Sequence, residues 1–343
     1  MKVLVTGGCG FIGSWVCEYY AKKGDKVIAY DNLTKHELMR TGYNVDAARD
    51  YNCDYLKGLG VQLVKADVRN QDELFEYSRD CDFIAHTAAQ PAMTISIEDP
   101  VLDFTTNVSG TLNVLEAARK FKIPVVSCAT IHVYGNAVNK ELKAGKTRYI
   151  RKVAAIDEKY PILTGNITPL HASKAAGDIY ARAYIETYKV QAASFRLTGL
   201  YGPRQLGGED HGWVANFCIR AMMNLPVTIY GTGKQVRDIL YAEDLVRAFD
   251  AFYRERIPGI YNIGGGRRNM LSLLEAIDII SSLLGKKIPL QSGPERYGDL
   301  KYFVCDSAKA RKALGWSAKI RPEEGIKRLI GWIEENRELF KQK

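Results

Sequence analysis

Short apolar segments alternate with helix-periodic stretches over the first 200 residues of the chain. The helical pattern is clearest at Val108–Lys120 and Lys174–Tyr188. Strands separated by helices in this way predict parallel crossover connections, hence an α/β fold with a doubly wound parallel sheet whose ligands bind at the carboxyl ends of the strands. The predicted strands are Lys2–Thr6, Lys26–Tyr30, Gln62–Ala66, Asp82–His86, Val125–Ala129 and Ala192–Arg196.

The pattern changes after about Tyr201. A glycine-rich loop spans 202–212, a helix is predicted around Trp213–Met223 and a short strand at Thr228–Tyr230, and amphipathic helices follow near the C-terminus. These elements predict a smaller α/β lobe that holds a substrate, while Arg237–Tyr253 and Gly259–Gly264 are expected to return to the first lobe. The predicted division is 1–195 plus 235–264 for the first domain and 196–234 plus 265–343 for the second.

The first strand leads into Gly7-x-x-Gly10-x-x-Gly13 and then into a helix, an order typical of a Rossmann dinucleotide-binding site. Gly7 allows a tight turn, Gly10 lets backbone N–H groups approach a pyrophosphate, and Gly13 permits close packing of helix and strand. The helix N-terminus attracts negative charge. Asp31 ends the next strand 18 residues after Gly13, at the spacing of an acid that binds ribose hydroxyls, which favours NAD over NADP.

Composition sets limits on the class of protein. The chain has 343 residues, 46% hydrophobic and 25% charged, as in an ordinary globular protein, and no apolar run reaches the roughly 20 residues that span a bilayer. Met1 leads directly into a strand without a signal-peptide pattern, so a cytoplasmic protein without membrane contact is expected. Seven scattered cysteines show neither metal-binding spacing nor a disulfide framework, so reduced packing residues and no metal site are predicted.

The formal net charge is +9, and part of the excess lies in one cluster. No aromatic stacking platform or helix-turn-helix pattern accompanies it, so a solvated loop is favoured over a nucleic-acid site. Attraction of a doubly negative diphosphate substrate is the alternative. The cluster comprises Lys140, Lys143, Lys146, Arg148, Arg151 and Lys152.

Four places in the sequence, three at strand ends and one at the start of a helix, carry candidate chemistry. Asp67 closes the third strand, where a carboxylate can meet the adenine amino group or simply form a turn. The small residues after His86 allow a cofactor to approach. Thr130 ends the fifth strand, where its hydroxyl can hydrogen-bond a sugar hydroxyl. Lys174 begins a long helix and, if buried beside a ribose, would bind its hydroxyls and lower the pKa of neighbouring acids.

Together these segments resemble the extended short-chain dehydrogenase/reductase family, the NAD-dependent epimerases and dehydratases, over nearly the whole chain. Members modify nucleotide-linked sugars with a bound nicotinamide cofactor, and many are homodimers built on two long helices of each subunit. Four segments resemble most the branch that epimerises CDP-linked sugars at C2: Gln90–Pro100, Thr147–Tyr149, Gly212–Cys218 and Gly231–Asp238.

The resemblance implies NAD as cofactor, a nucleotide-diphosphate sugar as substrate and two sets of contact residues. The residues expected at the cofactor are Gly7, Gly10, Phe11, Ile12, Gly13, Asp31, Asn32, Asp67, Val68, Thr87, Ala88, Ala89, Gln90, Asn107 and Lys174. The residues expected at the substrate are Met93, Thr94, Thr130, Thr198, Arg204, Gln205, Trp213, Arg237 and Arg296.

Planar guanidinium groups suit bidentate contacts with diphosphate oxygens, so the three arginines are predicted clamps. For Arg237 an ion pair with Asp238 or Asp244 is the alternative. Trp213 is expected near a base or sugar, and a core role is equally open.

The chain departs from the family at its Tyr-x-x-x-Lys motif, because Leu170 precedes Lys174 where the family has a proton-accepting tyrosine. Leucine cannot transfer a proton. The predicted substitutes are His171 and His132, since an imidazole titrates near neutral pH, and a structural role is the alternative for each. A protein that binds NAD and nucleotide sugar without turnover, and a reaction that needs no base here, also stay open.

The residues after Thr130 separate the family's reactions. Its dehydratases follow this threonine with an Asp-Glu pair, whereas this chain has Ile131-His132, so dehydration is disfavoured. The predicted activity is epimerisation at C2 or C4 by transient oxidation of a ring hydroxyl and return of hydride to the other face. A nucleotide-sugar oxidoreductase or decarboxylase is the second hypothesis.

Overall fold

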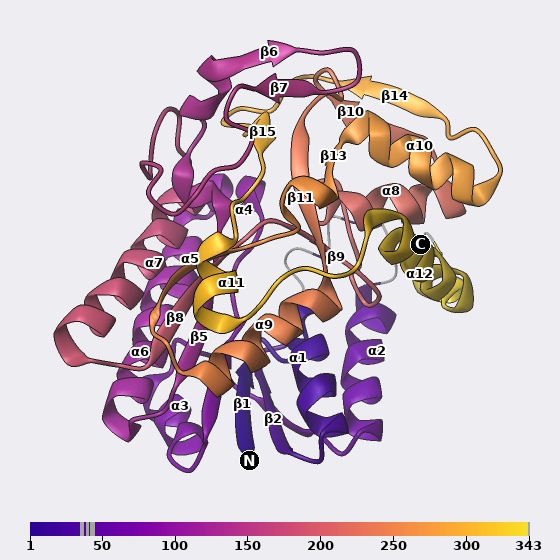
Figure 1. Cartoon of the computed structure of the whole chain (residues 1–343). Coiled ribbons are helices and arrows are strands. Elements are labelled where there is room, and N and C mark those ends of the chain that lie inside the picture. Colours follow the sequence, from indigo (N-terminus) through magenta and orange to yellow (C-terminus); the bar gives the residue numbers. More distant parts are fainter. Residues whose placement is uncertain (35–37, 39–40, 42–44, 342–343) are drawn as a thin grey trace.

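The computed structural model describes residues 1–34, 38, 41 and 45–341. Its centre is a seven-stranded, fully parallel sheet with the strand order β12-β8-β5-β4-β1-β2-β3 (Figure 1). All six predicted strands are present, and no end differs from its prediction by more than one residue. The strands are β1 (Lys2–Thr6), β2 (Lys26–Asp31), β3 (Gln62–Lys65), β4 (Phe83–His86), β5 (Val125–Thr130), β8 (Ala192–Leu197) and β12 (Gly259–Ile263).

Helices cover both faces of this sheet, which explains why its strands are apolar at consecutive positions. In β1, Val3 and Val5 pack into one core and Leu4 into the other, because successive side chains of a strand point to opposite faces. The first core is closed by α1 (Phe11–Lys22), α2 (Val45–Gly58), α9 (Ala242–Glu255) and α11 (Ala308–Leu314). The second is closed by α3 (Gln71–Ser78), α6 (Gly110–Phe121) and α7 (Pro169–Tyr188).

The chain between β4 and α6 runs along the carboxyl edge of the sheet. Two short helices, α4 (Met93–Glu98) and α5 (Pro100–Phe104), continue into the π-helical turn η2 (Thr105–Ser109) and then α6. After β5 comes a 3₁₀ turn, η3 (Ile131–Tyr134), and then a second, η4 (Ala137–Glu141). These connections place Met93, Thr94, Thr130 and His132 above the strand ends.

A smaller lobe with its own apolar core lies above the carboxyl edge (Figure 1). Its strands form a pair, β10 (Val227–Tyr230) with β14 (Leu290–Gly293), and a mixed sheet in which β11 (Val236–Tyr241) pairs with β9 (Gly199–Tyr201), β13 (Met270–Ser272) and β15 (Tyr302–Phe303). Its helices are α8 (Trp213–Met222), α10 (Leu273–Leu284) and α12 (Pro322–Glu335), and the 3₁₀ turns η5 (Gly266–Asn269) and η6 (Arg337–Phe340) complete the elements.

Two segments, 237–253 and 259–264, were expected to return to the first lobe, and only the second does so completely. The segment 259–264 supplies β12, an edge strand of the large sheet. In the segment 237–253, α9 packs on the large sheet, whereas β11 belongs to the smaller one. The exact domain boundaries stay a prediction.

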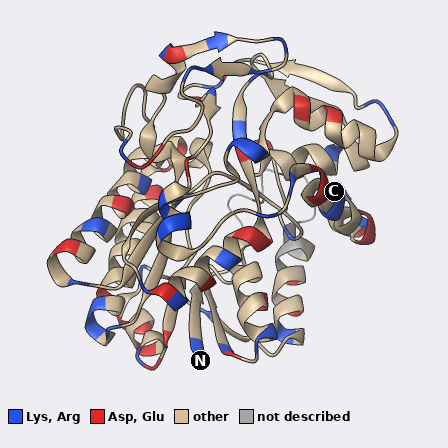
Figure 2. Ribbon diagram, in the orientation of Figure 1, with Lys and Arg blue, Asp and Glu red and all other residues tan. Residues whose placement is uncertain are grey.

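The basic cluster lies around a hairpin of β6 (Leu142–Ala144) and β7 (Tyr149–Arg151), and its four lysines are exposed to solvent. Arg148 forms an ion pair with Glu275 and Arg151 with Glu141. Figure 2 shows acidic and basic residues interspersed along the elements.

Candidate active site

A large cleft lies at the carboxyl ends of the central strands, between the two lobes. Its volume is ≈ 680 Å³, and its walls combine the glycine turn after β1 with residues of α4, η3, α7 and the small lobe. A smaller pocket of ≈ 110 Å³ adjoins it and shares Gly7, Gly10, Thr87 and Ala89 with the cleft. The strand order reverses between β1 and β4, the place where open α/β sheets bind their ligands.

The glycine turn has the geometry that the fingerprint predicted. Gly7 has φ +67°, and a Cβ there would lie 2.6 Å from the backbone nitrogen of Ala88. A Cβ on Gly13 would lie 2.0 Å from the carbonyl oxygen of Gly7, so only glycine permits this packing of α1. Gly10 is the N-cap of α1 and has no side chain to satisfy the first N–H groups. Together with Phe11 and Ile12 it lines the cleft, so the positive end of α1 suits a pyrophosphate.

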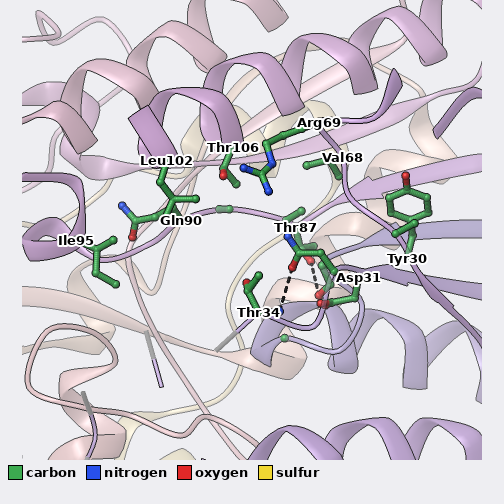
Figure 3. A pocket seen from close by; sticks show the side chains of 16 residues that line it. Tyr30, Asp31, Thr34, Val68, Arg69, Thr87, Gln90, Ile95, Leu102 and Thr106 are labelled. Carbon is green, nitrogen blue, oxygen red and sulfur yellow. Dashed lines mark hydrogen bonds between the residues drawn. The ribbon is translucent and has the colours of Figure 1, made fainter. Parts of the chain in front are cut away.

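Asp31 lies at the end of β2, on the wall of the smaller pocket (Figure 3). Its Oδ2 accepts a hydrogen bond from the Cys9 N–H at 2.9 Å and its Oδ1 one from the Leu33 N–H at 2.8 Å. These bonds fix the carboxylate beside the glycine turn. Figure 3 shows Asp31 and Thr34 on one side of the pocket and Leu102 and Thr106 on the other. A ribose next to a helix-bound pyrophosphate fits this arrangement.

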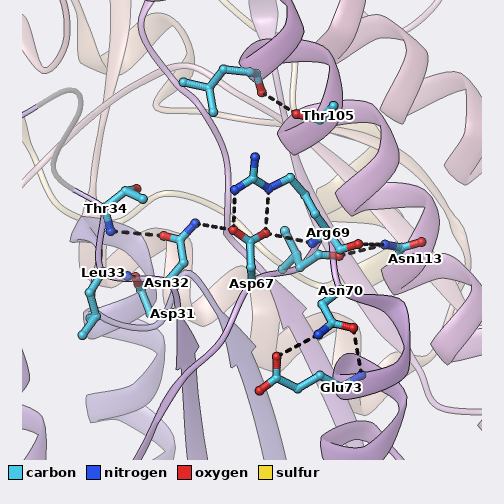
Figure 4. Close-up of polar contacts among 12 residues, drawn as sticks. Asp31, Asn32, Leu33, Thr34, Asp67, Arg69, Asn70, Glu73, Thr105 and Asn113 are labelled. Atoms are coloured by element: carbon cyan, nitrogen blue, oxygen red, sulfur yellow. Dashed lines mark hydrogen bonds and ion pairs between the residues drawn. The ribbon is translucent and has the colours of Figure 1, made fainter.

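Asp67 joins Asn32 and Arg69 in a short chain of hydrogen-bonded side chains (Figure 4). It accepts hydrogen bonds from Asn32 at 2.9 Å and from the Arg69 Nη2 at 2.7 Å. Burial alone would raise the pKa of Asp67, but the hydrogen bonds from Arg69 and Asn32 outweigh burial and lower it to about 2. Asn32, Val68 and Arg69 line the pocket, whereas Asp67 stands behind them. Arg69 is a wall residue that sequence reasoning missed.

Gln90 and Asn107 form a buried brace beside the pocket. The Gln90 N–H donates to Asn107 Oδ1 at 3.0 Å, and Asn107 Nδ2 donates to Gln90 O at 3.0 Å and to Asp103 Oδ1 at 2.9 Å. Gln90, Ala88, Ala89 and Thr87 line the pocket, but Asn107 does not. Its geometry favours a role in holding the segment after β4 in place.

Thr130, His132, Leu170 and Lys174 come together on the cleft wall, from the end of β5, from η3 and from the first turns of α7. The Lys174 Nζ donates to the carbonyl oxygen of Cys128 at 3.5 Å. Burial lowers the pKa of Lys174, while the Cys128 thiol and Asp103 oppose that shift. Thr130 Oγ1 accepts from the His132 N–H at 3.3 Å, which turns the chain into η3.

The two candidate histidines lie in contact with one another, but only His132 lines the cleft. Their rings are 5.2 Å apart at an angle of 87°. His171 is 1% exposed, and its Nδ1 accepts from the Thr168 N–H at 3.1 Å in a capping box that begins α7. Burial lowers the pKa of His171. Burial, His171 and Arg237 lower the pKa of His132 to about 3.

All nine predicted substrate residues line the cleft, and the three arginines differ in what holds them. Arg204 donates to Glu18 Oε2 at 2.5 Å and lies 4.7 Å from the ring of Trp15, which favours a role in docking the glycine-rich loop on α1. Arg237 donates to Asp299 Oδ1 at 3.2 Å and forms its ion pair there, so the suggested pairing with Asp238 or Asp244 is wrong.

The far end of the cleft contains the predicted Arg296 together with Glu209 and Tyr230, which sequence reasoning missed. Arg296 donates to the carbonyl oxygen of Glu209 at 2.7 Å and its guanidinium lies 4.0 Å from the ring of Tyr230. The carboxylate of Glu209 accepts from Tyr230 at 2.6 Å and from Thr228 at 3.0 Å. Glu209 lies in the glycine-rich loop and Tyr230 on β10, and no spacing in the sequence indicates that they meet.

The seven cysteines are free, as expected, and Cys9 and Cys128 line the cleft. Among residues 1–34, 38, 41 and 45–341, no cluster of histidine, cysteine, aspartate and glutamate side chains could hold a metal ion. No helix in the same part of the chain is long and apolar enough to cross a membrane.

The parallel sheet, the glycine turn and the acid at the end of β2 define a dinucleotide-binding protein of the Rossmann class. The chain belongs to the NAD dependent epimerase/dehydratase family, whose profile matches residues 3–264. CDP-paratose 2-epimerase of Salmonella typhi is 34% identical over 97% of this chain and 99% of its own length. The predicted resemblance to this family and branch is thereby confirmed.

Two solved structures of nucleotide-sugar epimerases are also similar to this chain. UDP-glucose 4-epimerase of Thermus thermophilus, a complex with NAD, superposes with a TM-score of 0.79 at 32% identity and covers 97% of this chain and 99% of its own. UDP-glucuronic acid 4-epimerase of Bacillus cereus, in complex with UDP-glucuronic acid and NAD, gives a TM-score of 0.81 at 26% identity and covers 98% and 100%.

Proposed function

We propose that the chain is an NAD-dependent epimerase of a nucleotide-diphosphate sugar. The observation that carries the proposal is the single cleft in which the glycine turn, the Thr130–Lys174 pair and the two arginines Arg237 and Arg296 meet. Similarity to CDP-paratose 2-epimerase over 97% of the chain favours a CDP-linked sugar and C2, and similarity to UDP-sugar 4-epimerases makes C4 of a UDP-linked sugar the second choice.

The residues present fit NAD. The N-terminus of α1 would bind the pyrophosphate, Asp31 the adenosine ribose, and Lys174 the hydroxyls of the nicotinamide ribose. NAD bound there would supply a hydride acceptor for a sugar carbon and would allow the hydride to be returned. We propose that Thr130 orients the reacting hydroxyl, that the charge of Lys174 favours its ionisation, and that Arg237 and Arg296 bind the diphosphate.

The test is direct. Purified protein with NAD is incubated with CDP-, UDP-, GDP- and dTDP-linked hexoses, and products are followed by NMR. We expect one sugar to give its epimer with no lasting rise in absorbance of reduced nicotinamide. Steady accumulation of NADH would favour an oxidoreductase or decarboxylase, and absence of any product would contradict the proposal.

A second candidate is a binding protein without turnover, which Leu170 favours because it removes the family's phenol from the cleft wall. Under this alternative the native chain binds NAD and nucleotide sugar but gives no product, and Leu170→Tyr creates activity. A working native enzyme excludes it.

We also propose a homodimer, built on α5, α6 and α7. Large apolar side chains on α5 and α7 are exposed in the single chain, among them Val101 at 70%, Phe104 at 56% and Tyr180 at 44%. A face of this kind is typical of an interface. Sedimentation should show a dimer for the native chain and a monomer for Val101→Asp/Tyr180→Asp. A monomeric native chain at micromolar concentration would contradict the proposal.

A cytoplasmic location, which suits seven free cysteines, is proposed as well.

A further inference from the structure

The place of the missing phenol is occupied by an apolar side chain, and nothing at that position can accept a proton. Leu170 is 4% exposed and lines the cleft wall beside Lys174. Its backbone N–H donates to Ser96 Oγ at 3.2 Å, so the first turn of α7 is fixed in place. A proton acceptor for the sugar hydroxyl must therefore come from a neighbouring element.

Few groups on this wall of the cleft can take a proton at neutral pH. The buried Cys128 thiol has its pKa raised to about 12, chiefly by burial. Lys174 is assigned by the proposed function to the ribose hydroxyls, and the Thr130 hydroxyl is not a base. Of the cleft-lining groups contributed by the end of β5, by η3 and by the first turns of α7, this leaves the imidazole of His132, two residues beyond Thr130.

We propose that His132 is the acid–base residue of the proposed epimerase, acting through Nε2 on the hydroxyl that Thr130 orients. Its Nδ1 is buried and has no hydrogen-bond partner within the described chain, so Nε2 is the nitrogen left to reach the cleft. The substrate O–H bond breaks and an N–H bond forms at Nε2. The same proton returns to the oxygen when the sugar is reduced, so the imidazole ends as it began.

His171 is assigned a positioning role behind His132. Its Nδ1 accepts the Thr168 N–H, so the neutral ring carries its proton on Nε2, which is buried and unpaired within the described residues. A ring that presents an N–H cannot accept a proton from its neighbour. The proton that His132 takes up is therefore held for return instead of passing into the protein, as an epimerisation requires.

Burial, then His171 on α7 and the guanidinium of Arg237 on β11, lower the pKa of His132, so its imidazole is uncharged in the free protein. A diphosphate bound at Arg237 would neutralise that positive charge and make the imidazole more basic in the complex than in the free protein. This change would offset only the contribution of Arg237, since burial and His171 would still lower the pKa of His132.

The first experiment measures imidazole tautomers and does not depend on turnover. Protein labelled with ¹⁵N-histidine and saturated with NAD is examined at pH 7 by long-range ¹H–¹⁵N NMR, with His132→Gln and His171→Gln to assign the two rings. We expect a neutral His132 with its proton on Nδ1 and a neutral His171 with its proton on Nε2. A neutral His132 protonated on Nε2 would overturn the inference, whatever the substrate.

The second experiment uses the nucleotide sugar that the product screen identifies. His132→Gln should lower kcat by about 100-fold to 10,000-fold with KM changed less than about 3-fold, and His171→Gln should cost less than His132→Gln. The double variant His132→Gln/Leu170→Tyr should regain at least about 10-fold. If the native chain is active and His132→Gln keeps its kcat within about 3-fold, the inference is wrong while the proposed function stands. If no sugar is converted, the proposed function fails and the acid–base role of His132 fails with it, while the tautomers still test the arrangement of the two rings.

Discussion

Replacing Lys174 with methionine is expected to lower kcat by at least about 100-fold, because the site then lacks the cation beside the ionising hydroxyl. Lys174 lines the cleft and its Nζ donates to the carbonyl of Cys128, which holds the side chain at the end of β5 near Thr130. The same change should weaken NAD binding by about 10-fold through the loss of a charged hydrogen-bond donor to ribose. Turnover of the identified sugar and calorimetric titration with NAD measure the two effects.

The Lys174→Met variant should be at least as stable to heat as the native protein, although its activity falls. Burial lowers the pKa of Lys174, so its charged form is less favourable in the folded chain than in water, and an apolar side chain of similar length removes that penalty. We expect the melting temperature of Lys174→Met to equal or exceed that of the native protein. Lys57→Met, at an exposed ion pair with Asp54 on α2, is the matched control and should leave both activity and NAD affinity unchanged. A Lys174→Met variant with native kcat would remove Lys174 from the mechanism.

Much of the fold could be predicted from the sequence because its signals are local. Each strand of the large sheet is a short apolar run between helices, and both faces of the sheet are buried, so periodicity alone identifies β1, β2 and β5. The strand pairing of the smaller lobe could not be predicted in this way. The strand β11 pairs with β9, β13 and β15, which lie far from it along the sequence, and no local pattern indicates those partners.

The cofactor side of the site was predictable for the same reason. Gly7, Gly10, Gly13 and Asp31 belong to one βαβ unit, in which spacing fixes geometry. The substrate side depends on side chains that meet only in the folded chain. The pairing of Arg237 with Asp299 spans 62 residues, and the contact of Arg204 with Glu18 spans 186, so sequence reasoning could predict that these arginines line the cleft but not what holds them.

The sequence also left open whether His132, His171 or neither replaces the phenol. The structure separates the two by a feature that no motif contains. His171 closes a capping box with Thr168 at the start of α7, and this local hydrogen bond removes Nδ1 from chemistry. His132 has no such partner for Nδ1 within the described residues and lines the cleft. Local helix capping therefore divides two adjacent histidines into one that caps α7 and one that lines the cleft.

Replacing Arg196 with methionine is expected to lower the free energy of unfolding by about 3–5 kcal/mol, because it leaves a buried carboxylate without its cation. Arg196, on β8, donates to Asp178 Oδ2 at 2.6 Å and to the Tyr134 hydroxyl at 2.9 Å, and both charged side chains are almost fully buried. Tyr134 in turn donates to Asn262 Oδ1 at 2.7 Å. The network joins β8, α7, η3 and β12, so its loss should loosen the turn that holds His132.

Guanidinium denaturation of three variants checks this expectation. Arg196→Met alone should be strongly destabilised, whereas Arg196→Met/Asp178→Leu should regain most of the loss, since replacing both partners removes the unpaired charge. Arg182→Met, at an exposed pair with Glu186 on α7, should unfold like the native protein because solvent screens that pair. If Arg196→Met unfolds at the native midpoint, the expectation is wrong. If the double variant is no more stable than the single one, the unpaired charge is not the cause of the lost stability.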